Sequence, residues 1–235
     1  AISRYVSGKQ HPLNLKVNCL LTISETLPEG AKEILKSAFN CPVISRYSNM
    51  ENGFLAQQCI EGNNEYHINL ASYFIEVLDP ERDIPVPAGT LGRIVVTDLF
   101  NYAMPLIRYD TGDMGILSEK SACGKIGSVF TKIEGRKVDF LYDTKGNLLS
   151  PHIVTNTMWK YSDCVRQFQF IQNDPKDYVI RLNCVKNTFE NSGKLIKDLR
   201  QFLGSDAKIK IELVDDIPVL SSGKRKKIIN NYIKN

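Results

Sequence analysis

The sequence predicts an α/β portion followed by a small α+β domain, and three observations support this fold class. Residues 16–47 have the patterns of a strand, an amphipathic helix and a second strand. Residues 53–109 contain short strand-like segments between turns. After Gly135, a hairpin signal precedes alternating helix and strand patterns. We therefore expect two domains, residues 1–135 and 136–235.

The first portion predicts a β-α-β unit. Residues 16–24 form an apolar run typical of a buried strand, and residues 42–47 return as a strand. Between them, Thr26 and Glu29 have the spacing of a capping box, and apolar side chains recur at helical spacing through residues 28–39. Two strands of one sheet that are joined by a crossover helix normally run parallel to each other, so we expect parallel pairing.

The middle of the chain predicts a small antiparallel sheet or barrel. Turn residues at Gly62–Asn64 and Pro87–Gly89 separate short segments with strand composition. These segments are residues 53–59, 66–70, 73–79, 92–99 and 105–109.

The last portion predicts an α-β-β-α-β domain after a hairpin. Residues 138–142 and 147–149 flank a turn at Thr144–Gly146. Ser150 and Pro151 suit the N-cap and first position of a helix that extends to about Tyr161. Two alternating strands follow, around Phe168–Phe170 and Ile180–Cys184. A helical stripe over residues 195–203 ends at Gly204, and residues 209–213 give a last strand.

Composition excludes several classes of protein. A net charge of +4 is too small to indicate a nucleic-acid binder, and no apolar run approaches the ~20 residues of a membrane helix. None of the six cysteines forms a CxxC pair, so metal-ligand spacing is missing and reduced thiols of a cytoplasmic protein are expected. The scattered His11, His67 and His152 are expected to be structural or exposed.

Four segments can carry chemistry, and each is weak when taken alone. A Thr-Gly-Asp sequence is usually a turn, and the basic run 224–227 is usually an exposed helix face or tail. In chain order the four segments are YSNMENG (47–53), RYDTGD (108–113), EGRKVD (134–139) and PVLSSGK (218–224).

Together, in this order, these segments resemble the adenylate-forming superfamily of acyl-CoA synthetases. The stretch GRIVVTDLFNYAMPLIRYDTGD (92–113) is close to the phenylacetate–CoA ligases, and residues 24–53 look more like the branch linked to capsular polysaccharide biosynthesis. The resemblance implies that residues 1–135 are the C-terminal portion of the large AMP-binding domain. It also implies that residues 136–235 are the small mobile C-terminal domain.

The resemblance also implies a role for each matching residue. Tyr47 matches the aromatic residue that stacks on adenine, and Glu51 matches the carboxylate that holds Mg²⁺ between phosphate oxygens. Asp113 and Arg136 match the acid and the arginine that reach the ribose. Lys224 matches the catalytic lysine of acyl-AMP formation. The implied ligands are ATP or AMP, Mg²⁺, a small carboxylic acid and CoA as acceptor, with no nucleic acid or membrane; a homo-oligomer is possible.

Three departures qualify this assignment. Met50 and Ser48 stand where the family usually has Thr and Gly. Val138 occupies the usual position of the hinge acid, two residues after Arg136, and Asp139 comes next, so residues 137–139 are taken together as the hinge. Nothing in residues 1–46 resembles the family's Ser/Thr/Gly-rich phosphate loop. We therefore expect a truncated form of a longer ligase that is inactive alone. The alternatives are a catalytically incomplete homologue that binds a nucleotide or a partner, and a nucleic-acid module that uses the basic tail.

Overall fold

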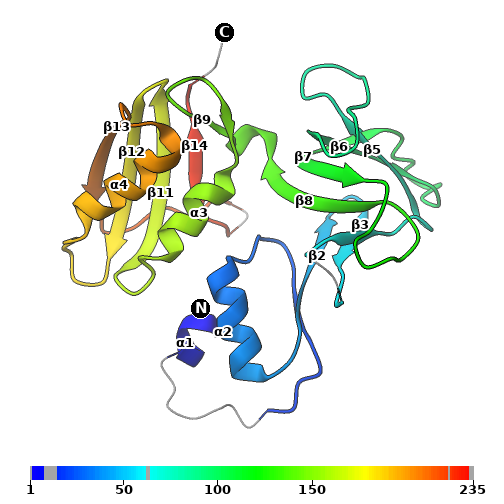
Figure 1. Cartoon of the computed structure of the whole chain (residues 1–235), viewed down its shortest axis with the longest axis horizontal. Coiled ribbons are helices and arrows are strands. Elements are labelled where there is room, and N and C mark those ends of the chain that lie inside the picture. Colours follow the sequence, from blue (N-terminus) through cyan, green and yellow to red (C-terminus); the bar gives the residue numbers. More distant parts are fainter. Residues whose placement is uncertain (1, 8–14, 62–63, 222, 233–235) are drawn as a thin grey trace. The chain divides into compact units, whose positions relative to one another are not determined.

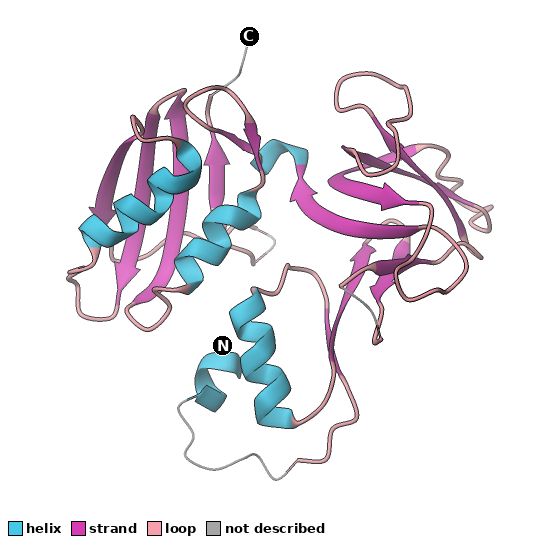
Figure 2. Cartoon of the chain, in the orientation of Figure 1, coloured by secondary structure: helices cyan, strands magenta, loops and turns pink. Residues whose placement is uncertain are grey.

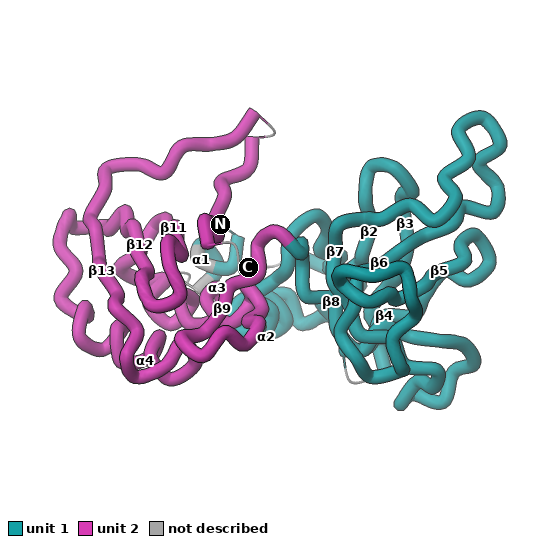
Figure 3. The backbone as a smooth tube through the Cα atoms, turned by 90° about the horizontal axis from the view of Figure 1, so that it is seen from above, with its two compact units in different colours: residues 1–137 teal, residues 138–235 magenta. Residues whose placement is uncertain are grey.

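The structure, a computed structural model, describes residues 2–7, 15–61, 64–221 and 223–232. The chain divides into two compact units, residues 1–137 and 138–235 (Figure 3). The division falls between Lys137 and Val138, within the segment expected to act as a hinge. Within the described ranges, no helix is both long and apolar enough to cross a membrane.

The first unit begins with helices and parallel strands (Figure 1). Its first elements are α1 (Ile2–Ser7), β1 (Leu20–Thr22), α2 (Glu29–Phe39) and β2 (Val43–Asn49). Strands β1 and β2 pair in parallel, with Leu20 opposite Val43, which confirms the predicted β-α-β unit. The predicted capping box is wrong, because α2 starts at Glu29 itself. Pro28 occupies the N-cap and offers no side-chain hydrogen bond.

Six further strands join β1 and β2 in one eight-stranded sheet. They are β3 (Gly53–Gln58), β4 (Tyr66–Ile68), β5 (Tyr73–Leu78), β6 (Leu91–Asp98), β7 (Tyr109–Ser118) and β8 (Val129–Arg136). The strand order is β1-β2-β3-β4-β8-β7-β6-β5, and every pair except β1–β2 is antiparallel. Figure 2 shows the strands of the chain in magenta. The expected small antiparallel sheet is therefore continuous with the β-α-β unit.

Two strand predictions in this unit need correction. Residues 105–108 lie outside any strand, and β7 begins at Tyr109 and continues to Ser118. Strand β8 was not anticipated. Both strands mix charged residues and glycines with few apolar side chains, so neither has the alternation that predicts a half-buried strand.

The sheet of the first unit is strongly curved. Three strands separate β2 from β7, which in a flat sheet would hold them about 19 Å apart at four spacings of about 4.8 Å. Nevertheless, the Tyr47 hydroxyl of β2 lies 2.8 Å from the Asp113 carboxylate of β7. The curled face encloses an apolar core: Tyr47, Leu55, Ala56, Tyr73, Val77, Ile94, Val96 and Phe130.

The second unit is a four-stranded sheet with two helices over one face (Figure 1). It contains the 3₁₀ turn η1 (Lys137–Asp139, which begins one residue before the division), β9 (Leu141–Tyr142), β10 (Leu148–Leu149), α3 (Pro151–Trp159), β11 (Val165–Asp174), β12 (Asp177–Cys184), α4 (Ser192–Leu203), β13 (Lys208–Leu213) and β14 (Ile228–Asn230). Val154 and Met158 of α3 and Leu195 and Leu199 of α4 pack with the strands in one buried cluster. The predicted hairpin, helices and strands are confirmed.

One strand of this unit was missed. The sheet order is β13-β12-β11-β14, so β13 is not the last strand. Ile228 of β14 lies opposite Phe170 of β11 in parallel register. The signal was hidden because β14 has only three residues and directly follows the basic run 224–227.

Replacement of the α3 cap is expected to destabilise the second unit. The Ser150 side chain accepts a hydrogen bond of 3.2 Å from the His152 backbone amide. Ser150→Ala should lower the free energy of unfolding by about 1 kcal/mol, whereas Ser150→Asp, which keeps an acceptor, should stay close to the wild type. Urea unfolding followed by the fluorescence of Trp159, the only tryptophan, measures both. Equal stability of the two variants would contradict a capping role.

Candidate functional site

A bulge in β7 shapes the first part of the site. Pairing with β6 jumps from Arg93–Met114 to Val95–Asp110, so residues 111–113 stand opposite Ile94 alone. The Thr111 hydroxyl donates to the Ile94 carbonyl (2.9 Å) and accepts from the Asp113 amide (3.1 Å). Gly112 adopts a φ of 74°, a conformation that favours glycine. The Thr-Gly-Asp motif is therefore a turn inside a strand, and it sets the direction of Asp113.

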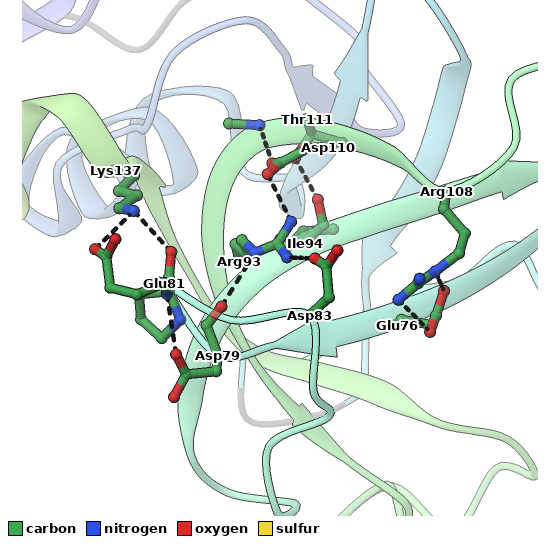
Figure 4. A network of polar contacts seen from close by, with 12 residues as sticks. Glu76, Asp79, Glu81, Asp83, Arg93, Ile94, Arg108, Asp110, Thr111 and Lys137 are labelled. Carbon is green, nitrogen blue, oxygen red and sulfur yellow. Dashed lines mark hydrogen bonds and ion pairs between the residues drawn. The ribbon is translucent and has the colours of Figure 1, made fainter.

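A charged network fixes the start of the bulge (Figure 4). The Arg93 guanidinium lies 2.8 Å from the Asp110 carboxylate, donates to the Asp79 carbonyl (3.0 Å) and pairs with Asp83. Asp110 in turn accepts from the Gly112 amide at 2.9 Å. Arg93 is largely buried, so these contacts act in a less screened environment than a surface ion pair. The network fixes Asp110 at the start of the bulge.

The end of β8 is fastened to the same unit. Lys137 donates to the Pro80 carbonyl (2.7 Å) and pairs with Glu81 (2.9 Å), as Figure 4 shows. Arg136 immediately precedes this anchor. The anchor therefore marks where the first unit ends.

Tyr47 links β2 to the bulge. Its hydroxyl donates to Asp113 Oδ2 at 2.8 Å and lies 3.4 Å from the Thr111 hydroxyl. Its ring is buried and meets Phe130 edge-on, with centroids 6.2 Å apart. Burial, and after it the nearby Asp113 charge, raises the pKa of Tyr47, so the phenol stays protonated and acts as a donor. Adenine stacking by Tyr47 stays a prediction.

Glu51 lies at the tip of the β2–β3 hairpin. Asn49 accepts from the Asn52 amide (2.7 Å) and donates to the Asn52 side chain (3.2 Å), and the Tyr73 hydroxyl donates to the Asn52 carbonyl. The turn is therefore held firmly while Glu51 itself is exposed. Burial first, and then the charge and hydrogen bond of Glu51, raise the pKa of Tyr109. This interaction joins the hairpin tip to the start of β7.

Arg136 completes the group of charged side chains. It is the cross-strand partner of Asp113 in the β7–β8 register and is exposed. Burial raises the pKa of Asp113, and the charges of Glu51 and Asp110 add to the rise. The hydrogen bond from Tyr47 and the Arg136 charge oppose it. The arrangement can accept hydrogen bonds from hydroxyl groups at Asp113 and bind an anion at Arg136.

The structure thus brings together four of the five predicted residues, namely Tyr47, Glu51, Asp113 and Arg136, all in the first unit. Sequence reasoning gave no role to Tyr109, which is joined to Glu51 and feels the Arg136 charge. A signal was available, because Tyr109 lies within the same motif, RYDTGD, as Asp113.

Lys224, the fifth predicted residue, lies in the second unit. It is exposed at the end of a turn in which its carbonyl accepts from the Leu220 amide (2.7 Å). Arg225 donates to the Ile217 carbonyl (2.7 Å) and anchors this turn, while Ser222 is outside the described residues. The basic run is not a helix face, because the Lys226 and Lys227 carbonyls accept hydrogen bonds from β11. These hydrogen bonds fix the backbone of the turn that carries Lys224.

Comparisons with known proteins concern the family resemblance and the fold of the chain. The family model of the CapK C-terminal domain matches residues 141–231. Protein CapK of Staphylococcus aureus is 26% identical over 235 residues, which cover 98% of this chain and 50% of CapK. A phenylacetate-coenzyme A ligase of Thermus thermophilus is 32% identical over 118 residues, which cover 50% of this chain and 26% of that ligase. The chain spans half, or less, of the length of these relatives.

Among solved structures, a 2-hydroxyisobutyryl-CoA ligase in complex with R3-HIB-AMP superposes with a TM-score of 0.74 at 19% identity. The superposition covers 91% of this chain and 48% of the ligase chain. At this identity the likeness concerns the fold. The fold and the sequence relatives together support the resemblance to the adenylate-forming superfamily. The family model and the relatives also support the resemblance to its branch of phenylacetate–CoA ligases and CapK.

The raised pKa of Asp113 predicts that this residue lowers the stability of the fold as the pH rises. A carboxyl group whose pKa is higher in the folded state stabilises the fold below its ordinary pKa and loses this contribution as the pH rises through the folded value. Asp113→Asn should therefore gain stability over the wild type as the pH rises from about 3 to 7. Hydrogen exchange of the β7 and β8 amides, followed at increasing urea concentration and at several pH values, would measure the difference in unfolding free energy between the variant and the wild type.

Glu119→Gln serves as the control, since Glu119 is an exposed carboxylate directly after β7. It removes one negative charge from the same unit without touching the bulge. A stability difference between Asp113→Asn and the wild type that stays constant with pH would contradict the assignment of strain to Asp113.

Proposed function

We propose that the protein to which this chain belongs activates a carboxylic acid with ATP as its acyl-AMP and passes the acyl group to CoA or another acceptor. The observation that carries the proposal is the convergence of Glu51, Tyr109, Asp113 and Arg136 around one bulge and one hairpin tip. The names of its relatives, a phenylacetate-coenzyme A ligase among them, support the same class of reaction. The chain spans half of CapK, so the proposal concerns the whole protein.

In this proposal the first unit binds the nucleoside part. Asp113, ionised and oriented by Tyr47, accepts hydrogen bonds from two ribose hydroxyls. Arg136 donates to the ribose from the neighbouring strand. Tyr47 stacks on adenine, which requires some opening of its buried ring, and Tyr109 offers a second aromatic surface next to Glu51.

Glu51 suits a magnesium ion bound together with phosphate. Mg²⁺ in phosphate-transfer sites uses one or two carboxylates, substrate oxygens and water, and an exposed carboxylate at a fixed hairpin tip meets that need. When bound, the ion would offset negative charge on the phosphates. Glu51 would hold the ion, and the Asn49–Asn52 hydrogen bonds would keep Glu51 in place.

The second unit supplies Lys224. Its ammonium group would donate to the α-phosphate and stabilise the charge that develops as the carboxylate attacks. Residues 137–139, where the two units meet in the chain, would act as the hinge for the change between the two half-reactions. The CapK resemblance supports a place in capsular polysaccharide biosynthesis, in the cytoplasm where ATP and CoA are available.

Lys224→Ala in the full-length protein should slow acid-dependent ATP–pyrophosphate exchange by about 100-fold or more, because loss of one preorganised donor costs about 2.7–4 kcal/mol. Thioester formation from supplied acyl-AMP should change much less. Lys226→Ala, which removes an exposed lysine two residues away, is the matched control and should behave like the wild type. Equal loss in both half-reactions would indicate a structural role for Lys224.

Met50 favours a second candidate function, a homologue that binds a nucleotide or partner without catalysis. Met50 is 96% exposed next to Glu51 in the chain, and its side chain has no hydroxyl to offer to a phosphate. Exchange assays of the full-length protein across aryl and aliphatic acids separate the candidates. AMP binding without any pyrophosphate exchange would support the second candidate and exclude the first.

A further inference from the structure

Three potential metal ligands meet away from the residues discussed so far. Cys59 directly follows β3, His67 is the middle residue of β4, and Cys123 lies in the loop between β7 and β8. The two sulfur atoms and an imidazole nitrogen all lie within 4.8 Å of one another. Cys123 Sγ is 3.2 Å from His67 Nε2. The spacing of the cysteines gave no sign of this cluster, because Cys59 and Cys123 lie far apart in the chain.

Contacts outside the cluster hold these three segments in place. Glu65 is buried, and its carboxylate accepts from the Ser121 hydroxyl (2.9 Å) and from the Ala122 amide (2.8 Å). The Glu65 carbonyl accepts from the Cys59 amide at 2.8 Å. One residue therefore fixes the position of Cys59 and of the Cys123 loop together. The cluster is preorganised rather than a chance approach of mobile side chains.

The geometry matches the demands of zinc. Bond lengths of about 2.3 Å to sulfur and about 2.0–2.1 Å to nitrogen place the ligand atoms of a tetrahedral site about 3.5–4 Å apart. Cys123 Sγ and His67 Nε2 need to separate by about 0.4 Å to reach this range, and the other ligand pairs already lie within 4.8 Å. Thiolate and imidazole ligands select zinc over magnesium, whereas Glu51 has the opposite preference.

We propose that Cys59, His67 and Cys123 form a zinc site, with water as the fourth ligand. The ion joins β3, β4 and the β7–β8 loop. Strand β4 has three residues and lies between β3 and β8, so such a cross-link stabilises a short paired segment of the curved sheet. A hydrogen-bonded thiol cluster without metal, and a Cys59–Cys123 disulfide, are the competing states.

Metal content tests this proposal without reference to enzyme activity. The chain is stripped with a chelator under reducing conditions, and zinc is then added back and quantified by mass spectrometry and by competition with a chromogenic chelator. We expect one zinc per chain and a higher Tm with zinc. Cys123→Ser should weaken zinc affinity by at least about 100-fold, since even loss of an outer-shell partner costs about 10–100-fold.

Cys41→Ser and Cys19→Ser are matched controls, because Cys41 is buried like Cys59 and Cys19 is half-buried like Cys123, in the same unit. Both should bind zinc as the wild type does. Cobalt substitution of the wild-type chain should give thiolate-to-metal charge-transfer absorption, which does not depend on any variant folding correctly. Failure to retain zinc, equal affinity of Cys123→Ser, or a Cys59–Cys123 disulfide in the reduced preparation would overturn the proposal.

Discussion

The hydrogen bond between Tyr47 and Asp113 is the contact on which the rest of the first unit depends. It joins β2 to β7 across three intervening strands, which is possible only because the sheet curls over its apolar core. The same contact orients the carboxylate that the proposed ribose site requires. The curvature of the sheet and the geometry of the site therefore depend on the same pair of side chains.

Maintaining this pair has an electrostatic cost. Asp113 is desolvated and lies near two other carboxylates, and the single donor from Tyr47 and the charge of Arg136 only partly offset this. A core built for stability alone would place an apolar or amide side chain there. Retention of a strained carboxylate at a bulge is typical of a functional site, where activity is kept at the expense of stability.

The sequence predicted those parts of the fold that local periodicity specifies. Helix α4, with its leucine stripe and Gly204, and the Ser150 cap of α3 are examples. Strands β8 and β14 escaped prediction because β8 has a mixed composition and β14 has only three residues, and because β14 pairs with the distant β11. For the same reason the support of the site was hidden. The Arg93–Asp110 pair and the contact of Tyr73 with Asn52 join residues 17 and 21 positions apart. The four predicted residues of the first unit came from resemblance to a family, not from composition.

The central claim is that one face of the first unit, formed by the hairpin tip and the bulge, binds the nucleoside. Titration of the isotopically labelled chain with AMP, followed by backbone amide NMR, tests it most directly. We expect the largest changes in amide chemical shift at residues 49–53, at residues 109–113 and at Arg136. Saturable changes centred on the second unit, or none at these positions at millimolar AMP, would contradict it.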